Sequence, residues 1–572
     1  MPDHAAPRAG WIRVPDRALR WTIAAVLLPL VLFLILRPET YGPSVNRLDG
    51  WFYTGYAANF DDILPAISDH HYFVSRWTLY LPSYLFSEVF GPEFGRLLLR
   101  WIVASCMLLA LWSLGRRWKW GAATELVVGT VVISTPMFAR AFFTDYFEWV
   151  TASVGLILVC LSLSRPRWAR TITIAVLAAL IVGTNPTAGT VVAGPVLIYL
   201  LRLLRGRWQR ALLHGAAMAL TGGAVLAMGL LVFRWHYGID NIYAPTVDFI
   251  RSNTDYVEPL RSPTLTWMAA YVWIYTPIVL LVFAALIRPA RELLRRDWVV
   301  VAAFVLMMVQ YAYQFADQFV RQFVGLEIEY YWAFVYPTFL VAAAITLGAV
   351  RWTWAWAVGF IGVWLGTLIL LSAWDLNIPG RIFLLVAVIA AVALAALPRL
   401  PRASSSARLP IVALTLLQVG LVATQLAPPA YTPPASHRFD LRPYFEEVYL
   451  NPNSPDVQRF RDALWLVDLL DHTRRDRQLF FVIGQSDFMG ALYGAHVTGH
   501  MIYPDAEGHP PPDAVAFLTS TKAAILLYGD AEQLATTVAQ FEEAGLEGRI
   551  TWKSPVSPRT GAMAWRFAVR PR

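Results

Sequence analysis

Apolar segments long enough to cross a bilayer follow one another along the chain from residue 21 to residue 427. A helix needs about 20 apolar residues to span the hydrocarbon, and shorter spans are tolerated, so we expect about thirteen spans. They cover residues 21–36, 95–114, 122–138, 149–163, 171–184, 188–203, 211–233, 266–287, 298–315, 330–349, 352–372, 381–398 and 409–427. Residues 171–203 form either two short spans or one re-entrant pair, which leaves the number open by about two. The pattern predicts a mainly α, polytopic transmembrane bundle.

Basic residues occupy every second connection between these spans. After the N-terminal arginines they recur at Arg116, Arg117 and Lys119, at Arg165, Arg167 and Arg170, at Arg202, Arg205, Arg207 and Arg210, at Arg288, Arg291, Arg295 and Arg296, at Arg351, and at Arg399, Arg402 and Arg408. The intervening connections are poor in basic residues and rich in acidic and aromatic ones. Short loops rich in Lys and Arg face the cytoplasm. We therefore expect residues 1–20 in the cytoplasm and, with an odd number of spans, the C-terminal tail outside.

The composition excludes several classes of protein. Apolar residues make up 57% of the chain and charged residues only 15%, a balance typical of a multi-pass membrane protein and not of a soluble one. The formal charge of +8 lies mostly in the short loops, so it indicates topology and not nucleic-acid binding. Cys106 and Cys160 both lie in apolar spans, which predicts neither a disulfide framework nor a cysteine metal site. No small-x-small cleavage motif follows residue 36, so we expect an uncleaved first helix.

The tail, residues 428–572, differs in character from the membrane part. It begins with a proline-rich linker, which favours an extended spacer. Helical patterns follow at 456–472 and 530–543, and strand-like runs at 479–483, 496–503, 514–518, 523–528, 549–553 and 564–569. About 145 residues suffice for one independent core. We expect an extracytoplasmic α/β domain after a transmembrane domain that covers residues 21–427.

Acidic residues are concentrated in the predicted outer loops. The large first outer loop, residues 37–94, carries Asp49, Asp61, Asp62, the triplet Asp69-His70-His71 and many aromatic side chains. The second carries Asp145 and Glu148. Carboxylates are costly beside hydrocarbon, so such a concentration suggests a functional site on the outer face. The alternative is a solvated loop with an interfacial aromatic belt.

Four features together resemble the C-type glycosyltransferases (the GT-C superfamily), which include protein O-mannosyltransferases and lipid A aminoarabinose transferases. The first outer loop has an early acidic residue followed by an aromatic run, Asp49-Gly50-Trp51-Phe52-Tyr53. Residues 76–90 have the pattern of an amphipathic segment lying along the membrane. The second outer loop has Thr144-Asp145-Tyr146, and a soluble outer domain closes the chain. The resemblance covers residues 21–426, and its short motifs are unspecific for substrate.

This resemblance implies transfer of a sugar from a polyprenyl-phosphate donor to a glycan, lipid or protein acceptor of the cell envelope, outside the inner membrane. It implies that Asp49 is the general base of an inverting reaction; Asp49-Gly50 also suits a simple turn. Asp145 is a second catalytic carboxylate that orients acceptor or metal, or else a helix cap. Glu148 is a substrate-binding candidate, although a charge at a helix start explains it more simply.

The remaining candidates concern the donor and a metal. Arg321 and Arg381 suit the donor phosphate because a guanidinium binds phosphate with two hydrogen bonds. Tyr53, Tyr330 and Tyr331 suit a platform for lipid or sugar, and all of these residues also suit interfacial anchors. Asp69, His70 and His71 have metal-ligand side chains, but three adjacent residues converge poorly on one ion. A divalent metal ion is thus the one cofactor suggested, and only weakly.

Two other functions fit the composition. A transporter or flippase of a lipid-linked intermediate needs polar residues midway along its spans, or inverted repeats around broken helices. A non-catalytic envelope-assembly protein needs only an outer domain that binds a partner. The ionisable residues crowd the outer loops and avoid the spans. That distribution favours an enzyme at the membrane surface.

Overall fold

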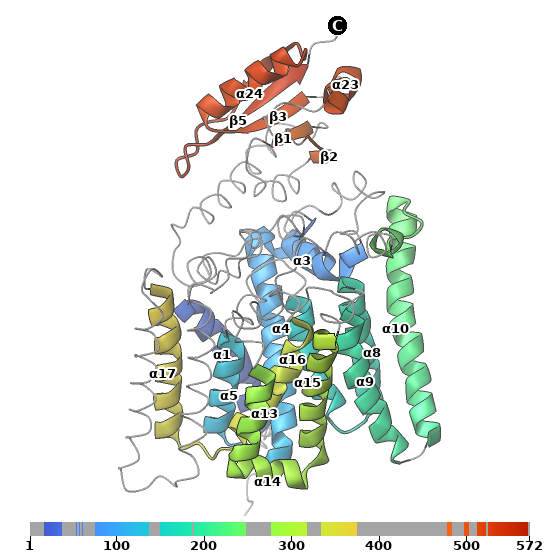
Figure 1. Cartoon of the computed structure of the whole chain (residues 1–572), viewed down its shortest axis with the longest axis vertical. Coiled ribbons are helices and arrows are strands. Elements are labelled where there is room, and N and C mark those ends of the chain that lie inside the picture. Colours follow the sequence, from blue (N-terminus) through green and yellow to red (C-terminus); the bar gives the residue numbers. More distant parts are fainter. Residues whose placement is uncertain are drawn as a thin grey trace, which may run out of the picture.

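The computed structural model describes residues 16–36, 53, 56–57, 60, 75–135, 149–185, 188–206, 208–247, 276–316, 333–373, 478–482, 497–502, 512–521 and 524–569. These residues form a bundle of helices and a smaller five-stranded sheet (Figure 1). The predicted fold class, a mainly α helical bundle with a C-terminal α/β part, is confirmed. The predicted domain boundaries stay a prediction.

The helices of the bundle coincide with the predicted spans. They are α1 (Asp16–Leu36), α4 (Pro92–Gly115), α5 (Ala122–Ser134), η3 (Trp149–Val154) continued by α7 (Gly155–Ser162), α8 (Trp168–Thr184), α9 (Gly189–Leu204), α10 (Trp208–Tyr237), α13 (Thr276–Leu286), α15 (Trp298–Ala316), α16 (Tyr336–Gly348) and α17 (Trp354–Ala373). Within the described residues, three helical stretches are long and apolar enough to cross a membrane by themselves: Phe94–Trp118, Trp208–Tyr237 and Trp298–Ala316. The predicted spans 381–398 and 409–427 lie outside the described residues.

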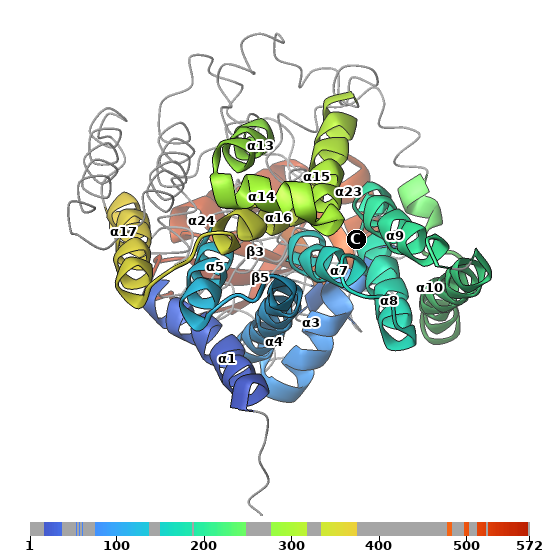
Figure 2. The same ribbon diagram turned by 90° about the horizontal axis from the view of Figure 1, so that it is seen from below.

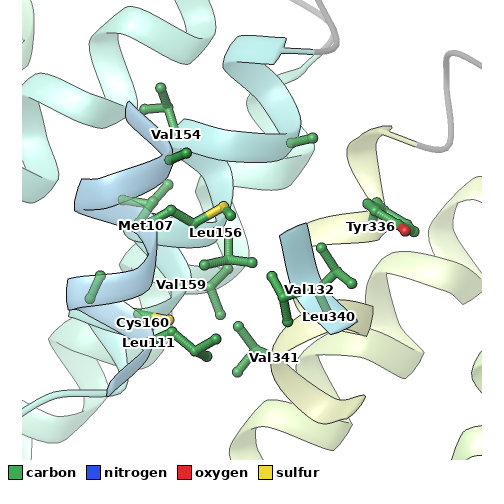
Figure 3. Close-up of a cluster of buried hydrophobic side chains, with 14 of the residues drawn as sticks. Met107, Leu111, Val132, Val154, Leu156, Val159, Cys160, Tyr336, Leu340 and Val341 are labelled. Atoms are coloured by element: carbon green, nitrogen blue, oxygen red, sulfur yellow. The ribbon is translucent and has the colours of Figure 1, made fainter. Parts of the chain in front are cut away.

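The centre of the bundle is formed by α4, α5, α7 and α16 (Figure 3). Met107 of α4, Val132 of α5, Val159 and Cys160 of α7 and Val341 of α16 are all buried among one another. A helix that is apolar on every side suits this position because it contacts either other helices or lipid around its whole circumference. The α7 segment, GLILVCLS, has that composition.

Residues 171–203 form two short antiparallel helices. The Thr171 hydroxyl, near the start of α8, lies 2.8 Å from the Tyr199 hydroxyl near the end of α9. It also lies 2.5 Å from Nδ1 of His214 in α10, so all three helices meet at this end. Because a buried hydroxyl or imidazole needs a hydrogen-bond partner, this group fixes the register of α8, α9 and α10.

A proline inside α9 explains one buried polar group in the neighbouring helix. Pro195 has no N–H, so the carbonyl of Val191 lacks its usual helical donor. Nε2 of Gln310 in α15 donates to that carbonyl at 3.3 Å, and Thr338 of α16 donates to Oε1 of Gln310 at 2.8 Å. Gln310 thereby satisfies the interrupted helix and joins α9, α15 and α16.

Connections from the predicted basic set lie at one end of the bundle. Arg117, after α4, forms an ion pair with Asp297, which directly precedes α15. Trp21 at the start of α1 donates to Glu125 at the start of α5 over 2.9 Å. A short cationic helix, α14 (Arg288–Arg296), lies across this same end (Figure 2). For these connections the predicted alternation is confirmed.

The C-terminal sheet has the strand order β2-β1-β3-β5-β4. Its strands are β1 (Gln478–Val482), β2 (Val497–Ile502), β3 (Ala524–Gly529), β4 (Gly548–Lys553) and β5 (Met563–Val569). β1 is parallel to β2 and β3, whereas β5 is antiparallel to β3 and β4. The predicted helix 530–543 is confirmed as α24 (Ala531–Glu543), which begins with a capping box of Asp530 and Gln533.

One predicted strand is wrong. Residues 514–518 belong to a helix, α23 (Pro512–Thr521). Val515 packs against a core that includes the fully buried Leu518, whereas Ala516, the residue after Val515, is exposed. Apolar positions three apart follow the helical period, and a proline at the first position suits a helix start. The short apolar run AVAFL resembles a buried strand because it is too brief to distinguish the two periods.

Candidate active site

The predicted amphipathic segment 76–90 is helix α3 (Trp77–Phe90), which lies at the end of the bundle opposite α14 (Figure 1). Its side chains Trp77, Tyr80 and Ser83 are buried against the bundle, whereas Leu85 and Val89 are exposed. Exposed apolar side chains beside buried polar ones suit a helix in the membrane interface. The two faces of α3 thus match those of a helix that lies along a membrane surface.

Two glycines let α3 approach the bundle closely. A Cβ at Gly183 of α8 would lie 2.8 Å from the methyl group of Thr78. A Cβ at Gly229 of α10 would lie 2.6 Å from the ring of Trp77. Carbon atoms that are not bonded do not come that close, so any other residue at either position would push α3 outward.

The chain that follows α10 fixes the start of α3. Nε1 of Trp77 donates to the Tyr243 hydroxyl over 3.1 Å, and the Ser75 and Thr246 hydroxyls bond to each other. Burial raises the pKa of Tyr243, and the bond from Trp77 lowers it by less. Tyr243 therefore stays a neutral phenol, which accepts from the indole. These contacts hold residue 76 in place between Ser75 and Trp77.

Arg76 contacts the first outer loop. Its guanidinium donates to the Tyr53 hydroxyl, and its central carbon lies 5.6 Å from the centre of that ring. Both side chains are buried. Further along the loop, the Tyr56 ring stacks on Tyr80 of α3 with centroids 4.7 Å apart, and Phe60 lies 5.1 Å from the same ring. Tyr53, Tyr56 and Phe60 of the first outer loop are thus packed against α3 and the residue that precedes it.

Tyr80, at the centre of this aromatic group, is not a candidate base. Burial raises the pKa of Tyr80 well above its ordinary value, and the neighbouring Tyr56 and Tyr53 raise it further. Its hydroxyl stays protonated at physiological pH. A proton acceptor in this region has to be a carboxylate or a histidine.

Two further arginines are buried in the first turns of α4. Arg96 and Arg100 are four residues apart, so they share one face of the helix, and at most 1% of either side chain is exposed. The guanidinium carbon of Arg100 lies 3.7 Å from the ring centre of Trp149, and its Nη1 lies 3.5 Å from the Ser83 hydroxyl. Buried guanidinium groups are costly unless anions or dipoles compensate them. Among the described residues, Arg100 thus joins α4 to α3 and to the start of η3.

Among the sequence-predicted site residues, the structure describes Tyr53 and brings it together with Arg76. The others lie outside the described residues: Asp49, Asp145, Glu148, Arg321, Arg381, Tyr330, Tyr331 and the weak metal candidates Asp69, His70 and His71. Within the described part of the chain, no group of three His, Cys, Asp or Glu side chains could hold a metal ion.

Sequence reasoning missed the three buried arginines. A signal was present for Arg96 and Arg100, because they lie at the outer end of the predicted span 95–114. Outer ends of spans are normally poor in arginine, so two in this position are an exception to the charge pattern. Their placement four residues apart also puts both on one face of the helix. Arg76 lies inside the predicted amphipathic segment and had no comparable signal.

Comparison with known proteins identifies the architecture. No protein-family model and no curated protein matches the sequence. The structure matches ArnT from Cupriavidus metallidurans bound to undecaprenyl phosphate, with a TM-score of 0.54 over 96% of this chain and 98% of that one. The chain has the fold of ArnT. At 14% sequence identity, this likeness establishes the fold and confirms the predicted resemblance at that level.

Two other solved structures are similar at lower scores. Apo ArnT from the same organism has a TM-score of 0.48 and 14% identity, over 96% of this chain and 98% of that one. Arabinosyltransferase EmbB from Mycobacterium smegmatis has a TM-score of 0.38 and 15% identity, over 73% of this chain and 42% of that one. With the ArnT fold, the helices described here belong to a multi-pass membrane protein.

Proposed function

We propose that this protein is an integral membrane glycosyltransferase, which transfers a sugar from a polyprenyl-phosphate donor to an extracytoplasmic acceptor. The observation that carries the proposal is the burial of Arg76, Arg96 and Arg100 at the end of the bundle where the first and second outer loops join it. The ArnT neighbour, whose structure contains undecaprenyl phosphate, supports the same class of donor.

The two arginine contacts involve the loops that carry the candidate carboxylates. Tyr53, which Arg76 contacts, is four residues after Asp49. Trp149, which Arg100 contacts, is four residues after Asp145. An extended chain spans at most about 3.6 Å per residue, so each carboxylate lies within about 14 Å of its anchor, measured between Cα atoms. This short separation along the chain supports both carboxylates as candidates for the same site as the buried arginines.

The proposed reaction divides the work among these groups. The oxygen of the acceptor hydroxyl bonds to the anomeric carbon of the sugar from the side opposite the phosphate. Asp49 accepts the proton of that hydroxyl as the bond forms. The bond between that carbon and the phosphate oxygen breaks, so the configuration inverts and polyprenyl phosphate leaves with one more negative charge. Arginine side chains stabilise that charge. Asp145 orients the acceptor.

The buried arginines are stronger candidates for binding the donor phosphate than the two arginines that were chosen from the sequence. Arg76 and Arg100 line the first outer loop and α3, whereas Arg321 and Arg381 rest on their sequence positions alone. Arg321, Arg381, Glu148, Tyr330 and Tyr331 remain proposals for the substrate-binding residues, together with Tyr53. A metal at Asp69, His70 and His71 also remains a proposal.

The proposed orientation follows from the charge pattern. The arginine-rich end, which includes α14, faces the cytoplasm, and the end with α3 faces outward. The C-terminal sheet lies beyond the α3 end in Figure 1, which supports an extracytoplasmic domain at residues 428–572. Donor, acceptor and this domain would then share one side of the inner membrane.

Binding of undecaprenyl phosphate by the purified full-length protein tests the donor site. We expect tighter binding of undecaprenyl phosphate than of undecaprenol, which lacks the anion, and loss of that preference in Arg100→Gln. Arg234→Gln is the matched control. Arg234 is an exposed arginine in the last turn of α10, at the same end of the bundle as α3. Equal binding of the two lipids would contradict the proposal. Binding with this preference but without sugar transfer in liposomes would favour the transporter alternative.

A further inference from the structure

A second cationic site lies at the opposite end of the bundle, where α14 meets α15. Asp297 occupies the junction, and both of its oxygens are engaged by Arg117, at 2.5 Å from Nε and 2.9 Å from Nη2. Nε1 of Trp118 donates to the same carboxylate over 3.0 Å, and the backbone N–H of Val299 over 3.0 Å. This carboxylate therefore has little capacity left to neutralise other arginines.

Two more arginines lie over the ring of Trp298, the residue that follows Asp297. The guanidinium carbons of Arg202 and Arg205 lie 5.1 Å and 4.5 Å from its ring centre. Arg202 is held further by the carbonyl oxygens of Ser162, at 3.2 Å, and Ser164. Arg205 is exposed, so one of its faces is open to a ligand.

Positive charge exceeds negative charge around this junction. The last turn of α14 adds Arg295 and Arg296, both exposed. We call the five side chains Arg117, Arg202, Arg205, Arg295 and Arg296 the inner arginine cluster; Asp297 is the carboxylate among them. One turn earlier, Glu292 is paired with Arg288 at 3.1 Å. The cluster thus has the charge to bind a multivalent anion.

Apolar side chains border the cluster. Trp298 is 37% exposed, and Leu204, the neighbour of Arg205 in the chain, is 48% exposed. A soluble anion or a nucleic acid would leave these side chains in water. A phospholipid would cover them with its acyl chains while its phosphate met the arginines. Charge and apolar surface together therefore favour a lipid.

We propose that the inner arginine cluster binds the headgroup of an anionic phospholipid from the surrounding bilayer. Arginine binds phosphate with two parallel hydrogen bonds, and tryptophan, as at position 298, is typical of the depth where headgroup meets acyl chain. Under the proposed orientation the lipid belongs to the cytoplasmic leaflet. The bound lipid would link η2 (Arg116–Trp118), the end of α9 and the end of α14, so it stabilises the bundle without touching the candidate active site.

Thermal unfolding of the purified full-length protein in detergent tests this site. We expect added phosphatidylglycerol to raise the unfolding midpoint by a few degrees, because a ligand that binds only the folded state stabilises it. Phosphatidylcholine and inorganic phosphate should each produce no such shift. An equal shift with phosphatidylcholine would contradict the proposal, and so would an equal shift with inorganic phosphate, since that would indicate a simple anion site.

Variants locate the effect. Arg205→Gln/Arg296→Gln should lose the phosphatidylglycerol shift, whereas Arg210→Gln, which removes an exposed arginine from the start of α10, should keep it. If the first variant does not fold, Arg295→Gln/Arg296→Gln decides, because both side chains are exposed and their replacement should not disturb packing. A full shift in these variants, or its equal loss in Arg210→Gln, would overturn the assignment to the cluster.

Discussion

The guanidinium carbon of Arg100 lies 3.7 Å from the centre of the Trp149 ring. Trp149 directly follows Glu148 and is four residues after Asp145, so this contact fixes the point at which the second outer loop re-enters the bundle. Ser83 of α3 lies 3.5 Å from the same guanidinium. Arg100 therefore joins α4, α3 and the second outer loop.

Arg100→Lys tests whether this geometry matters. Lysine keeps the charge but cannot stack as a planar group on the indole. A buried cation–π contact contributes about 2 kcal/mol, so we expect sugar transfer in liposomes to fall by about tenfold or more. Trp149→Phe, which keeps an aromatic face, should be affected less than Trp149→Leu. Wild-type rates in both Arg100→Lys and Trp149→Leu would show that the contact has no role in activity.

Gly229→Ala should displace α3. The added Cβ would lie 2.6 Å from the Trp77 ring, and overpacking of this kind costs about 1–3 kcal/mol. We expect a lower unfolding midpoint and weaker donor binding. Gly223→Ala is the matched control in the same helix, because its Cβ would meet nothing within 4 Å. The control should be neutral or slightly stabilising, since alanine favours helix over glycine. An equal drop in unfolding midpoint and donor binding in both variants would contradict the claim that Gly229 lets α3 pack closely on the bundle.

Much of the fold was predictable because the bilayer imposes it. Helix positions follow from apolar length, and the gathering of Arg117 and Asp297 at one end follows from charge alternation. The period of short segments is harder to determine, which is why residues 514–518 were assigned to a strand although they lie in α23.

The candidate site was predictable only in part. The acidic loops and Tyr53 are visible in the sequence as clusters of costly residues near hydrocarbon. Arg76 contacts Tyr53, which is 23 positions earlier in the chain. Arg76 directly precedes α3, and the close packing of α3 on the bundle depends on Gly183 and Gly229. Such a contact depends on tertiary packing, and no local pattern encodes it.

The stability of the arginine-rich end should depend on acidic pH through Asp297. Burial raises the pKa of this carboxyl, but the hydrogen bonds from Arg117, Val299 and Trp118, together with the positive charge of Arg117, lower it below its ordinary value of 3.8. A lowered pKa stabilises the folded state above the ordinary value, and that contribution is lost as the pH falls through the folded-state pKa. In unfolding midpoints measured from pH 7 to pH 3, Asp297→Asn should start lower and fall less steeply than wild type. Parallel profiles would contradict this role.

Cysteine labelling tests the orientation. In a protein with Cys106→Ser and Cys160→Ala, we expect Ser436→Cys in the linker to react with an impermeant maleimide added to intact spheroplasts. Gly206→Cys, in the exposed connection between α9 and α10, should react only after the membrane is opened. The charge pattern requires these two sites on opposite sides. Reversed labelling would place the candidate carboxylates on the cytoplasmic side.

Sugar transfer by Asp49→Asn tests the central claim most directly. Asparagine keeps the shape of the side chain but cannot accept the acceptor proton, and loss of a general base typically lowers the rate by about 10²–10⁴. Donor binding should survive, because the arginines are intact. Asp61→Asn, in the same loop, is the matched control. In liposomes with a polyprenyl-phosphate sugar donor, we predict a loss of this size for Asp49→Asn and a milder effect for Asp61→Asn. Near-normal turnover by Asp49→Asn would contradict the account.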